Sequence, residues 1–497
     1  MAVFKFRLNP ADLGTWRPEL KRAYVTGQDR TPGRVAVDLK PGMLTVSRPS
    51  PESGRFHVPW LVEGFGTPVI ATATLAERAA PYDLGVELAR GRLNDVRNQA
   101  ADWSMLGLKI PVGLDALIAE AQRAFARAAT SRDDPAAAQE GADRCLVAAC
   151  RAGEELAASY TEQVIKKRLE HAPKLPTHLG IALDGNPKAQ AWSTPILEGI
   201  NAARVRCPWG AVAADEGQFR WEETDLQLHW ARKRKLIPTI GPLLDLRPAA
   251  LPDWLWLWEG DYEEIQTQAA DFVRQAVTRY KGKVAGWHLI HRVASAEILG
   301  LSEEEQVRLT ARLIQVARQV DPQVPLIVDF DRPWAEWLAS SPYQLGPLHL
   351  ADSLARADLG LTGIGLEIAP GYGPAGSLMR DLFEFSRLLD LFALVNLPLH
   401  LSFAFPSAGG PDPRATEPGQ VDPMQWPGPP SAAQQAQRAR RWMSLAAAKP
   451  FVRSITWLQP TDALPHLFGH AGLFGLDGKP KPAFEALKGI KAAYLGG

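Results

Sequence analysis

The sequence predicts an α/β protein, a (β/α)8 TIM barrel preceded by an N-terminal β-rich domain and a helical connecting segment. Three observations predict it. Short apolar runs alternate with amphipathic stretches in the last two thirds of the chain, short runs broken by Pro and Gly fill its start, and Ala-rich helical periodicity lies between. We expect a small β-domain at 1–88, a helical segment at 89–175 and the barrel at 176–497.

Composition limits the classes of function. Hydrophobic residues make up 46% of the 497, and 55 Lys and Arg balance 55 Asp and Glu, so no bulk charge favours nucleic acid or anionic membrane. The three cysteines, Cys145, Cys150 and Cys207, are too few for a disulfide scaffold or a four-thiolate zinc site. No signal peptide or membrane span is visible, so we expect a cytoplasmic protein. Nothing in the composition indicates an oligomeric state.

Strand and turn signals dominate the N-terminal part. Arg34–Leu39 and Met43–Val46 read as a hairpin across a Pro-Gly turn, and Val69–Leu75 and Leu84–Leu88 as further strands. Ala136–Arg168 then shows apolar residues at helical spacing with almost no breakers. We expect these helices to pack on the barrel as scaffold.

The barrel part contains eight strand candidates in alternation with helices. The strands are Leu179–Asp184, Ala203–Trp209, Ile237–Leu244, Val284–His291, Pro325–Asp331, Gly363–Ile368, Leu397–Phe405 and Val452–Gln459. The helices are Glu222–Lys235, Tyr262–Tyr280, Glu303–Val320, Leu378–Leu394, Ala432–Ala448 and Pro482–Leu495. A doubly wound sheet is the alternative, but no Gly-rich phosphate loop follows the first strand. The Gly/Pro-rich stretch Ser407–Ser431 predicts a long loop over the barrel mouth.

Several segments, in order along residues 179–495, resemble the family-10 glycoside hydrolases, the xylanase-type barrels. The matching stretches are Glu216–Trp221 (EGQFRW), Leu251–Trp254 (LPDW), Tyr280–Val284 (YKGKV) with Trp287, Gly363–Leu366 (GIGL), Leu397–His400 (LPLH) and Lys479–Phe484 (KPKPAF). The resemblance implies the barrel fold and a carbohydrate ligand. It does not cover the first 175 residues.

The two catalytic positions of that family are substituted. Arg292 stands where the resemblance places the acid/base Glu at the end of the fourth strand, and Phe403 stands where it places the nucleophile on the seventh. A retaining glycosidase needs two carboxyl groups about 5–5.5 Å apart. Arg and Phe can serve neither role, so the ordinary xylanase mechanism is excluded.

Other carboxylates could supply hydrolysis. Strand parity directs Glu367, on the sixth strand, into the barrel at its C-terminal end, and directs Asp331, at the end of the fifth, the same way. Glu297, after the fourth strand, is a third candidate. The alternatives are that Glu367 pairs with Arg292, that Asp331 caps a turn, and that Glu297 belongs to a solvated helix start.

Aromatic and polar residues at strand ends predict a ligand groove, because indole faces stack on sugar rings. Packing in the core is the alternative for each Trp. The predicted substrate-binding residues are Trp209, Trp254, Trp287, His288, His291, Arg292, Trp334, Trp457 and Gln459. His466 and His470 lie four apart in a loop without a metal-binding motif, so we expect neither metal nor cofactor.

Two functions remain open. The first is a divergent glycoside hydrolase acting on a β-linked glycan through Glu367 with Asp331 or Glu297. The second is a catalytically inactive barrel that binds glycan. A carboxylate pair at hydrolytic separation favours the enzyme, and salt-bridged acids favour the binding protein.

Overall fold

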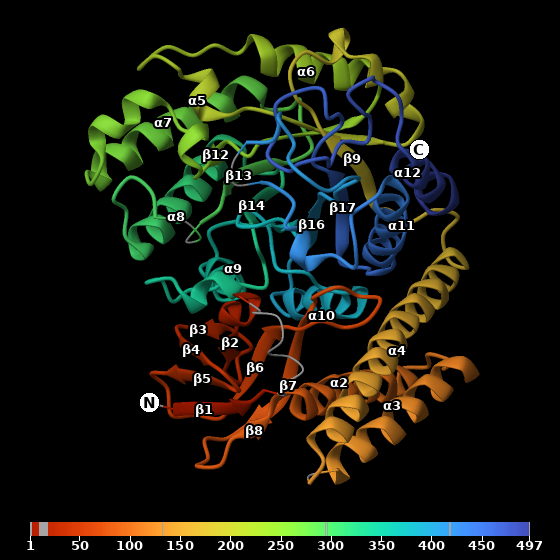
Figure 1. The fold of residues 1–497 in the computed structure, drawn as a ribbon. Helices are drawn as coiled ribbons and strands as arrows, with labels where there is room; N and C mark the ends of the chain where they lie inside the picture. The colour runs from red at the N-terminus through yellow and green to blue at the C-terminus, as the bar shows by residue number, and fades with distance from the viewer. Residues whose placement is uncertain are drawn as a thin grey trace.

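A closed barrel of parallel strands forms the centre of the molecule, as predicted (Figure 1). The computed structural model describes residues 2–8, 18–131, 133–293, 295, 297–416 and 419–496. Strand β17 pairs with β9 and β11 with β13, which closes the sheet. The barrel strands are β9 (His178–Ala182), β10 (Ala202–Val205), β11 (Ile237–Ile240), β13 (Trp287–His291), β14 (Leu326–Phe330), β15 (Gly363–Ile368), β16 (Leu399–Phe403) and β17 (Val452–Trp457). A two-residue strand, β12 (Leu244–Asp245), extends the pairing at the end of β13.

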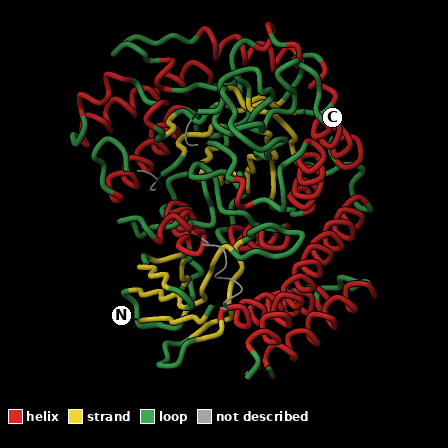
Figure 2. The backbone as a smooth tube through the Cα atoms, viewed as in Figure 1, coloured by secondary structure: helices red, strands yellow, loops and turns green. Residues whose placement is uncertain are grey.

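Helices surround the strands, and Figure 2 shows this outer layer in red. They are the four-residue α5 (Trp209–Val212), then α6 (Glu222–Lys233), α7 (Tyr262–Tyr280), α8 (Glu303–Val320), α9 (Pro347–Arg356), α10 (Leu382–Ala393), α11 (Ala432–Ala448) and α12 (Pro482–Tyr494). All six predicted helices are present. Helix α9 has no counterpart in the prediction because it is only ten residues long. Three short 3-10 turns occupy Pro187–Ala189, Ala191–Ser193 and Pro195–Glu198 after β9.

The N-terminal part contains two four-stranded sheets, so the predicted β-rich region is confirmed. One sheet has β1 (Ala2–Arg7), β4 (Ala36–Lys40), β5 (Met43–Arg48) and β8 (Tyr82–Asp83); the other has β2 (Tyr24–Thr26), β3 (Pro32–Gly33), β6 (Gly54–Pro59) and β7 (Val69–Leu75). The predicted hairpin is β4–β5, with Leu39 opposite Leu44.

The predicted strand Leu84–Leu88 is wrong, because these residues begin helix α2 (Leu84–Met105). The alternation over five residues suits a strand, but the buried positions continue through Ala89, Leu93 and Val96 at helical spacing. Helices α3 (Val112–Thr130) and α4 (Pro135–Leu169) follow. The boundary placed at residue 88 therefore falls inside α2, and one hydrophobic core joins the β-strands to all three helices. We still propose that a separate N-terminal unit precedes the barrel, whose core is a different cluster.

The N-terminal unit packs against the barrel along α10 and the loops around it (Figure 1). Arg380 donates to the Tyr24 hydroxyl over 3.0 Å, and Thr67 donates to the backbone of Met424 over 2.7 Å. The predicted mouth loop, Ser407–Ser431, is irregular apart from a 3-10 turn at Pro423–Gln425; residues 417 and 418 lie outside the described residues. No helix in the described part of the chain is long and apolar enough to cross a bilayer.

Candidate functional site

A buried charge cluster centres on Arg292 at the C-terminal end of the barrel. Arg292 follows β13 directly and has a φ of 70°, a left-handed conformation that is uncommon for a side chain of this size. This turn directs the guanidinium across the barrel end. Its Nη1 lies 3.1 Å from Asp331, and its Nη2 lies 3.1 Å from Glu367. Its Nε lies 3.3 Å from Asp245, the last residue of β12.

Two further arginines complete the charge balance of the cluster. Arg332 contacts Asp331 at 2.9 Å, and Arg247 contacts Asp245 at 2.6 Å. Burial alone would raise the pKa of Asp331, but Arg332 and Arg292 outweigh it and hold this pKa well below its usual range. The pKa of Asp245 is lowered in the same way, against its burial, chiefly by Arg247 and then by His291 and Arg292. Both groups are therefore carboxylates near neutral pH.

The structure brings Glu367 and Asp331 together, but it places a cation between them. Each carboxylate binds a different nitrogen of Arg292, which is the pairing weighed above as the alternative to a catalytic pair. Glu297 is exposed and makes no contact with the cluster in the described part of the chain. Asp331 and Glu367 therefore lie in one cluster, as predicted, and Glu297 lies outside it.

His291 lies between two of the acids. Its Nε2 is 3.8 Å from Glu367 and its Nδ1 is 3.9 Å from Asp245, and the residue is 8% exposed. The Nε2 atom has no hydrogen-bond partner among the described residues, so one buried polar atom at the barrel end is unsatisfied. The Nε of Arg292 makes no hydrogen bond there either, but it is ion-paired with Asp245.

A second polar layer lies deeper in the barrel. His288 contacts Asp329 at 2.9 Å, and Gly365 is required beside them because a Cβ there would overlap the Asp329 carboxylate. Burial opposes the ionisation of Asp329, yet His288 and Arg204 bring its pKa to about 2. Burial lowers the pKa of His400 to about 3, so this ring is neutral. His288 was predicted to bind the ligand, but here it pairs with Asp329 inside the barrel. The polar groups of this layer bind one another.

Sequence reasoning missed Asp245, Arg204 and His400. The predicted third strand ended at Leu244, one residue before Asp245, although parity would have continued to it. Arg204 lies within the predicted second strand and donates to Ser402 over 3.0 Å across the barrel. A charged residue inside an apolar strand was the available signal for an inward-facing group.

Phe403 does not face the barrel mouth. Its ring packs against Phe385 of α10 at 5.8 Å and against Phe405 at 5.7 Å, and it is fully buried. The adjacent Ser402, bonded to Arg204, is the inward residue. The position that the resemblance assigns to the nucleophile therefore lies in the layer between sheet and helices.

The predicted aromatic groove is wrong for most of its tryptophans. Trp209 is 2% exposed and stacks on Phe272 at 5.6 Å, with Trp254 packed edge-on against it at 6.1 Å. Trp287 is the first residue of β13, not one near its end, and its indole lies 3.3 Å from Asp321. These rings fill the core between strands and helices.

The other two tryptophans lie elsewhere. Trp457 is fully buried and donates to the backbone of Ala471 over 2.8 Å. Trp334 lies under the guanidinium of Arg380 at 5.2 Å, at the junction with the N-terminal unit. Apart from the Trp209–Trp254 pair, the five rings occupy separate packing environments, and they do not line one common groove.

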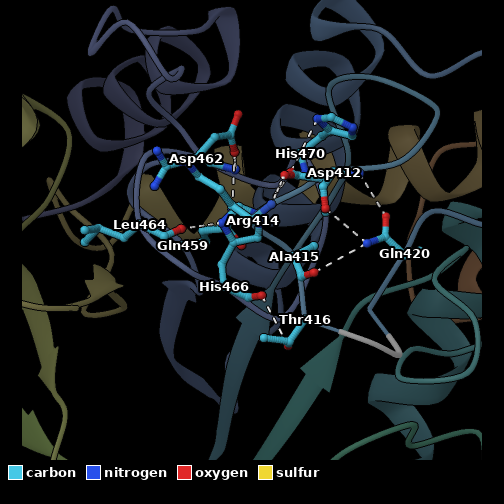
Figure 3. A network of polar contacts seen from close by, with 12 residues as sticks. Asp412, Arg414, Ala415, Thr416, Gln420, Gln459, Asp462, Leu464, His466 and His470 are labelled. Atoms are coloured by element: carbon cyan, nitrogen blue, oxygen red, sulfur yellow. Dashed lines mark hydrogen bonds and ion pairs between the residues drawn. The ribbon is translucent and has the colours of Figure 1, made fainter.

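Gln459 belongs to a polar network that joins the loops after β16 and β17 (Figure 3). It donates to Asp462 over 3.2 Å. In the same network His466 Nε2 lies 3.0 Å from Asp412, and the His470 backbone donates to Asp412 over 2.8 Å. No group of three or more potential metal ligands occurs among the described residues. The network holds the two mouth loops together.

Comparisons with known proteins give matches among solved structures alone. No family model matches the sequence, and no curated protein matches it. The chain is similar to native xylanase 10B from Thermotoga maritima, with 18% identity and a TM-score of 0.49 over 65% of this chain and 96% of that one. It is also similar to a GH10 endoxylanase from a sugarcane soil metagenome, with 17% identity and a TM-score of 0.48 over 64% and 97%. The strand pairing itself makes the chain a closed parallel (β/α)8 barrel, and both of these matched structures are xylanases.

Proposed function

We propose that this barrel binds a carbohydrate at the Arg292 cluster and does not hydrolyse it. The observation that carries the proposal is the placement of one guanidinium between Asp331 and Glu367. Both nitrogens that face the carboxylates are engaged, so the positive charge fills the space in which a scissile bond would have to lie.

The protonation states also oppose hydrolysis. A glycosidase needs one carboxylic acid that is protonated near neutral pH and one carboxylate. The pKa values of Asp331 and Asp245 are both lowered, so neither can donate a proton to a leaving group. Glu297, the candidate acid that the sequence left, is exposed and outside the cluster.

The unsatisfied Nε2 atom of His291 supports a polyhydroxylated ligand. A sugar hydroxyl both donates and accepts hydrogen bonds, so it can bind this nitrogen whichever tautomer the ring adopts. Leaving such a buried atom unpaired costs about 1–3 kcal/mol, and a bound hydroxyl would recover part of that cost. The sequence resemblance to xylanase-type barrels makes β-1,4-linked xylo-oligosaccharides the first probes.

Calorimetric titration with xylobiose to xylohexaose tests binding, and product analysis after long incubation tests hydrolysis. We expect saturable binding without products. His291→Leu should weaken binding about tenfold, the loss of one buried hydrogen bond. His229→Leu, at an exposed position on α6, is the matched control and should bind as wild type. Absence of binding to every β-linked oligosaccharide tried would contradict the proposal.

One observation favours the alternative, a divergent glycosidase. His291 Nε2 lies 3.8 Å from Glu367, so a protonated imidazole beside a carboxylate could supply an acid and a nucleophile or base. A screen of aryl β-glycosides separates the two functions. Turnover by wild type that disappears in Glu367→Gln would establish the enzyme, with Glu367 as its catalytic carboxylate.

A further inference from the structure

A groove of about 640 Å³ lies outside the barrel, between α4 of the N-terminal unit and helices α11 and α12. This volume is in the range of small-molecule sites, about 300–1,000 Å³. Figure 1 shows the C-terminal end of α4 approaching α11 and α12 at the edge of the molecule. Arg168 near the end of α4 donates to the backbone of Ala447 and Ala448 at the end of α11, which fixes the two helices at one end of the groove.

The floor of the groove is apolar. Ala158, Ile165 and Leu169 come from one face of α4, at spacings of seven and four residues. Leu382 of α10 and the ring of Tyr494 of α12 complete it. Such a surface suits an elongated hydrocarbon body, because burial of apolar area is the main source of binding free energy.

Three polar residues of the groove are hydrogen-bond donors without a partner among the described residues: Lys166, Arg440 and Ser444. Ser444 is only 8% exposed, and its hydroxyl makes no hydrogen bond to any described residue. Lys166 and Arg440 are exposed at the rim and form no ion pair within the described part of the chain. Arg441, in contrast, is neutralised by Glu154 at 2.6 Å.

Acidic groups at the groove are fewer. Glu170 is bound by Lys167 at 3.2 Å, which leaves Glu162 as the acid of the groove without an ion pair in the described chain. Two cations without an ion pair and an unpartnered hydroxyl, against one carboxylate without an ion pair, favour an anionic ligand head. The groove therefore combines an apolar floor with a rim complementary to one negative charge.

We propose that this groove binds an amphiphile with an apolar chain and a single anionic head group, of the class of a long-chain carboxylate. The head group lies between Lys166 and Arg440, and the chain lies along Ile165 and Leu169 toward Tyr494. This site is independent of the mouth and of the carbohydrate proposal. His291→Leu should leave it unchanged.

Calorimetric titration of the full-length chain with dodecanoate, below its aggregation concentration, tests the proposal. We expect one saturable site. Dodecanol, which has the chain without the charge, should bind at least tenfold more weakly, as should butyrate, which has the charge without the chain. Equal binding of dodecanoate and dodecanol would overturn the anionic head, and no binding of dodecanoate would overturn the site.

Two variants locate the binding. Arg440→Glu reverses an exposed rim charge and should weaken dodecanoate about tenfold or more without affecting dodecanol. Ala158→Trp fills the groove and should abolish binding of both. Arg123→Glu, on the exposed face of α3, is the matched control for charge reversal. Thermal unfolding checks that each variant is folded. Wild-type binding by both groove variants would place the ligand elsewhere and overturn the proposal.

Discussion

Two buried arginines hold carboxylates together in different parts of the molecule. Arg292, 6% exposed, binds Asp331 and Glu367 at the barrel mouth. Arg92 of α2, 2% exposed, binds Asp381 and, at 3.3 Å, Glu384 at the start of α10, where the N-terminal unit meets the barrel. Arg292 joins acids from two separate strand ends, whereas Arg92 holds two acids of one segment, the start of α10.

The two sites shift the pKa of their aspartates in opposite directions. Asp331 is in contact with two guanidinium groups, those of Arg332 and Arg292, and its pKa is lowered despite burial. Burial raises the pKa of Asp381 to about 6, because Arg92 is the one cation that opposes it, helped by a backbone hydrogen bond from Glu384, while Glu154 and Glu384 add negative charge nearby. The number of cations per carboxylate, not burial alone, decides which acid stays ionised.

Arg292→Met should have the largest effect. It leaves Asp245, Asp331 and Glu367 buried without their shared cation, and breaking such a pairing costs about 3–5 kcal/mol. Chemical denaturation at pH 7 measures the loss in free energy of unfolding. Arg292→Lys should lose less, because one ammonium can reach some but not all of the three acids. If Arg292→Met is as stable as wild type, the cluster contributes nothing to the fold.

Arg92→Met should destabilise less, by about 3 kcal/mol at pH 8, and still less at pH 5. Asp381 already has a pKa of about 6, so at pH 5 it can bind a proton in place of the lost cation. Denaturation of both arginine variants at the two pH values measures the difference. An Arg92→Met loss that is equal at pH 5 and pH 8 would contradict this explanation.

Periodicity and parity were enough to predict the barrel and the inward direction of Glu367. The eight strand segments, and α7, α8 and α11 with their observed limits, follow from patterns within single segments. The partners of Glu367 depend on the backbone after β13, where the left-handed φ of Arg292 turns its side chain back over the barrel. No pattern of residue types predicts that turn.

The tryptophans and Phe403 show the same limit. A large aromatic residue near a strand end has the same sequence signature whether it faces the mouth or the helices. Trp287 begins its strand, and Phe403 packs outward on Phe385, because the register of each strand is set by its neighbours. The direction in which these aromatic side chains point therefore depends on tertiary packing, which the sequence pattern does not reveal.

The acid dependence of stability should separate the two aspartates. Asp331 has a folded pKa below its unfolded value of 3.8, so its stabilisation is present above that value and is lost as the pH falls toward the folded pKa. Asp381 has a folded pKa of about 6, so its contribution is full below pH 3.8 and is lost as the pH rises through 6.

Denaturation of Asp331→Asn and Asp381→Asn between pH 3 and pH 8 tests this pair of signs. Wild type should lose about 1 kcal/mol of the Asp331 contribution by pH 3, and Asp331→Asn should lack that loss. Wild type should lose about 2 kcal/mol of the Asp381 contribution between about pH 4 and pH 6, and Asp381→Asn should lack that loss. Asn remains a good N-cap at position 381, where the side chain accepts from the Glu384 backbone. Curves of the two variants that change in the same direction would refute the comparison.

Arg332→Met should have the smallest effect and should make the first site resemble the second. Arg332 is partly exposed and shares Asp331 with Arg292, so its removal leaves one guanidinium on that carboxylate. We expect a loss of about 1 kcal/mol in the free energy of unfolding at pH 7, because Arg292 still prevents an unpaired buried charge.

The same variant should also change the pH dependence of stability. With one cation left, burial should raise the folded pKa of Asp331, so the loss of stability in acid should begin at a higher pH than in wild type. Lys488→Met, which removes the surface pair between α12 and Glu198, is the control and should leave the fall of stability in acid unchanged. If the free energy of unfolding of Arg332→Met falls at the same low pH as that of wild type, then Arg292 alone holds Asp331 ionised. The number of cations would then not explain why Asp331 and Asp381 differ.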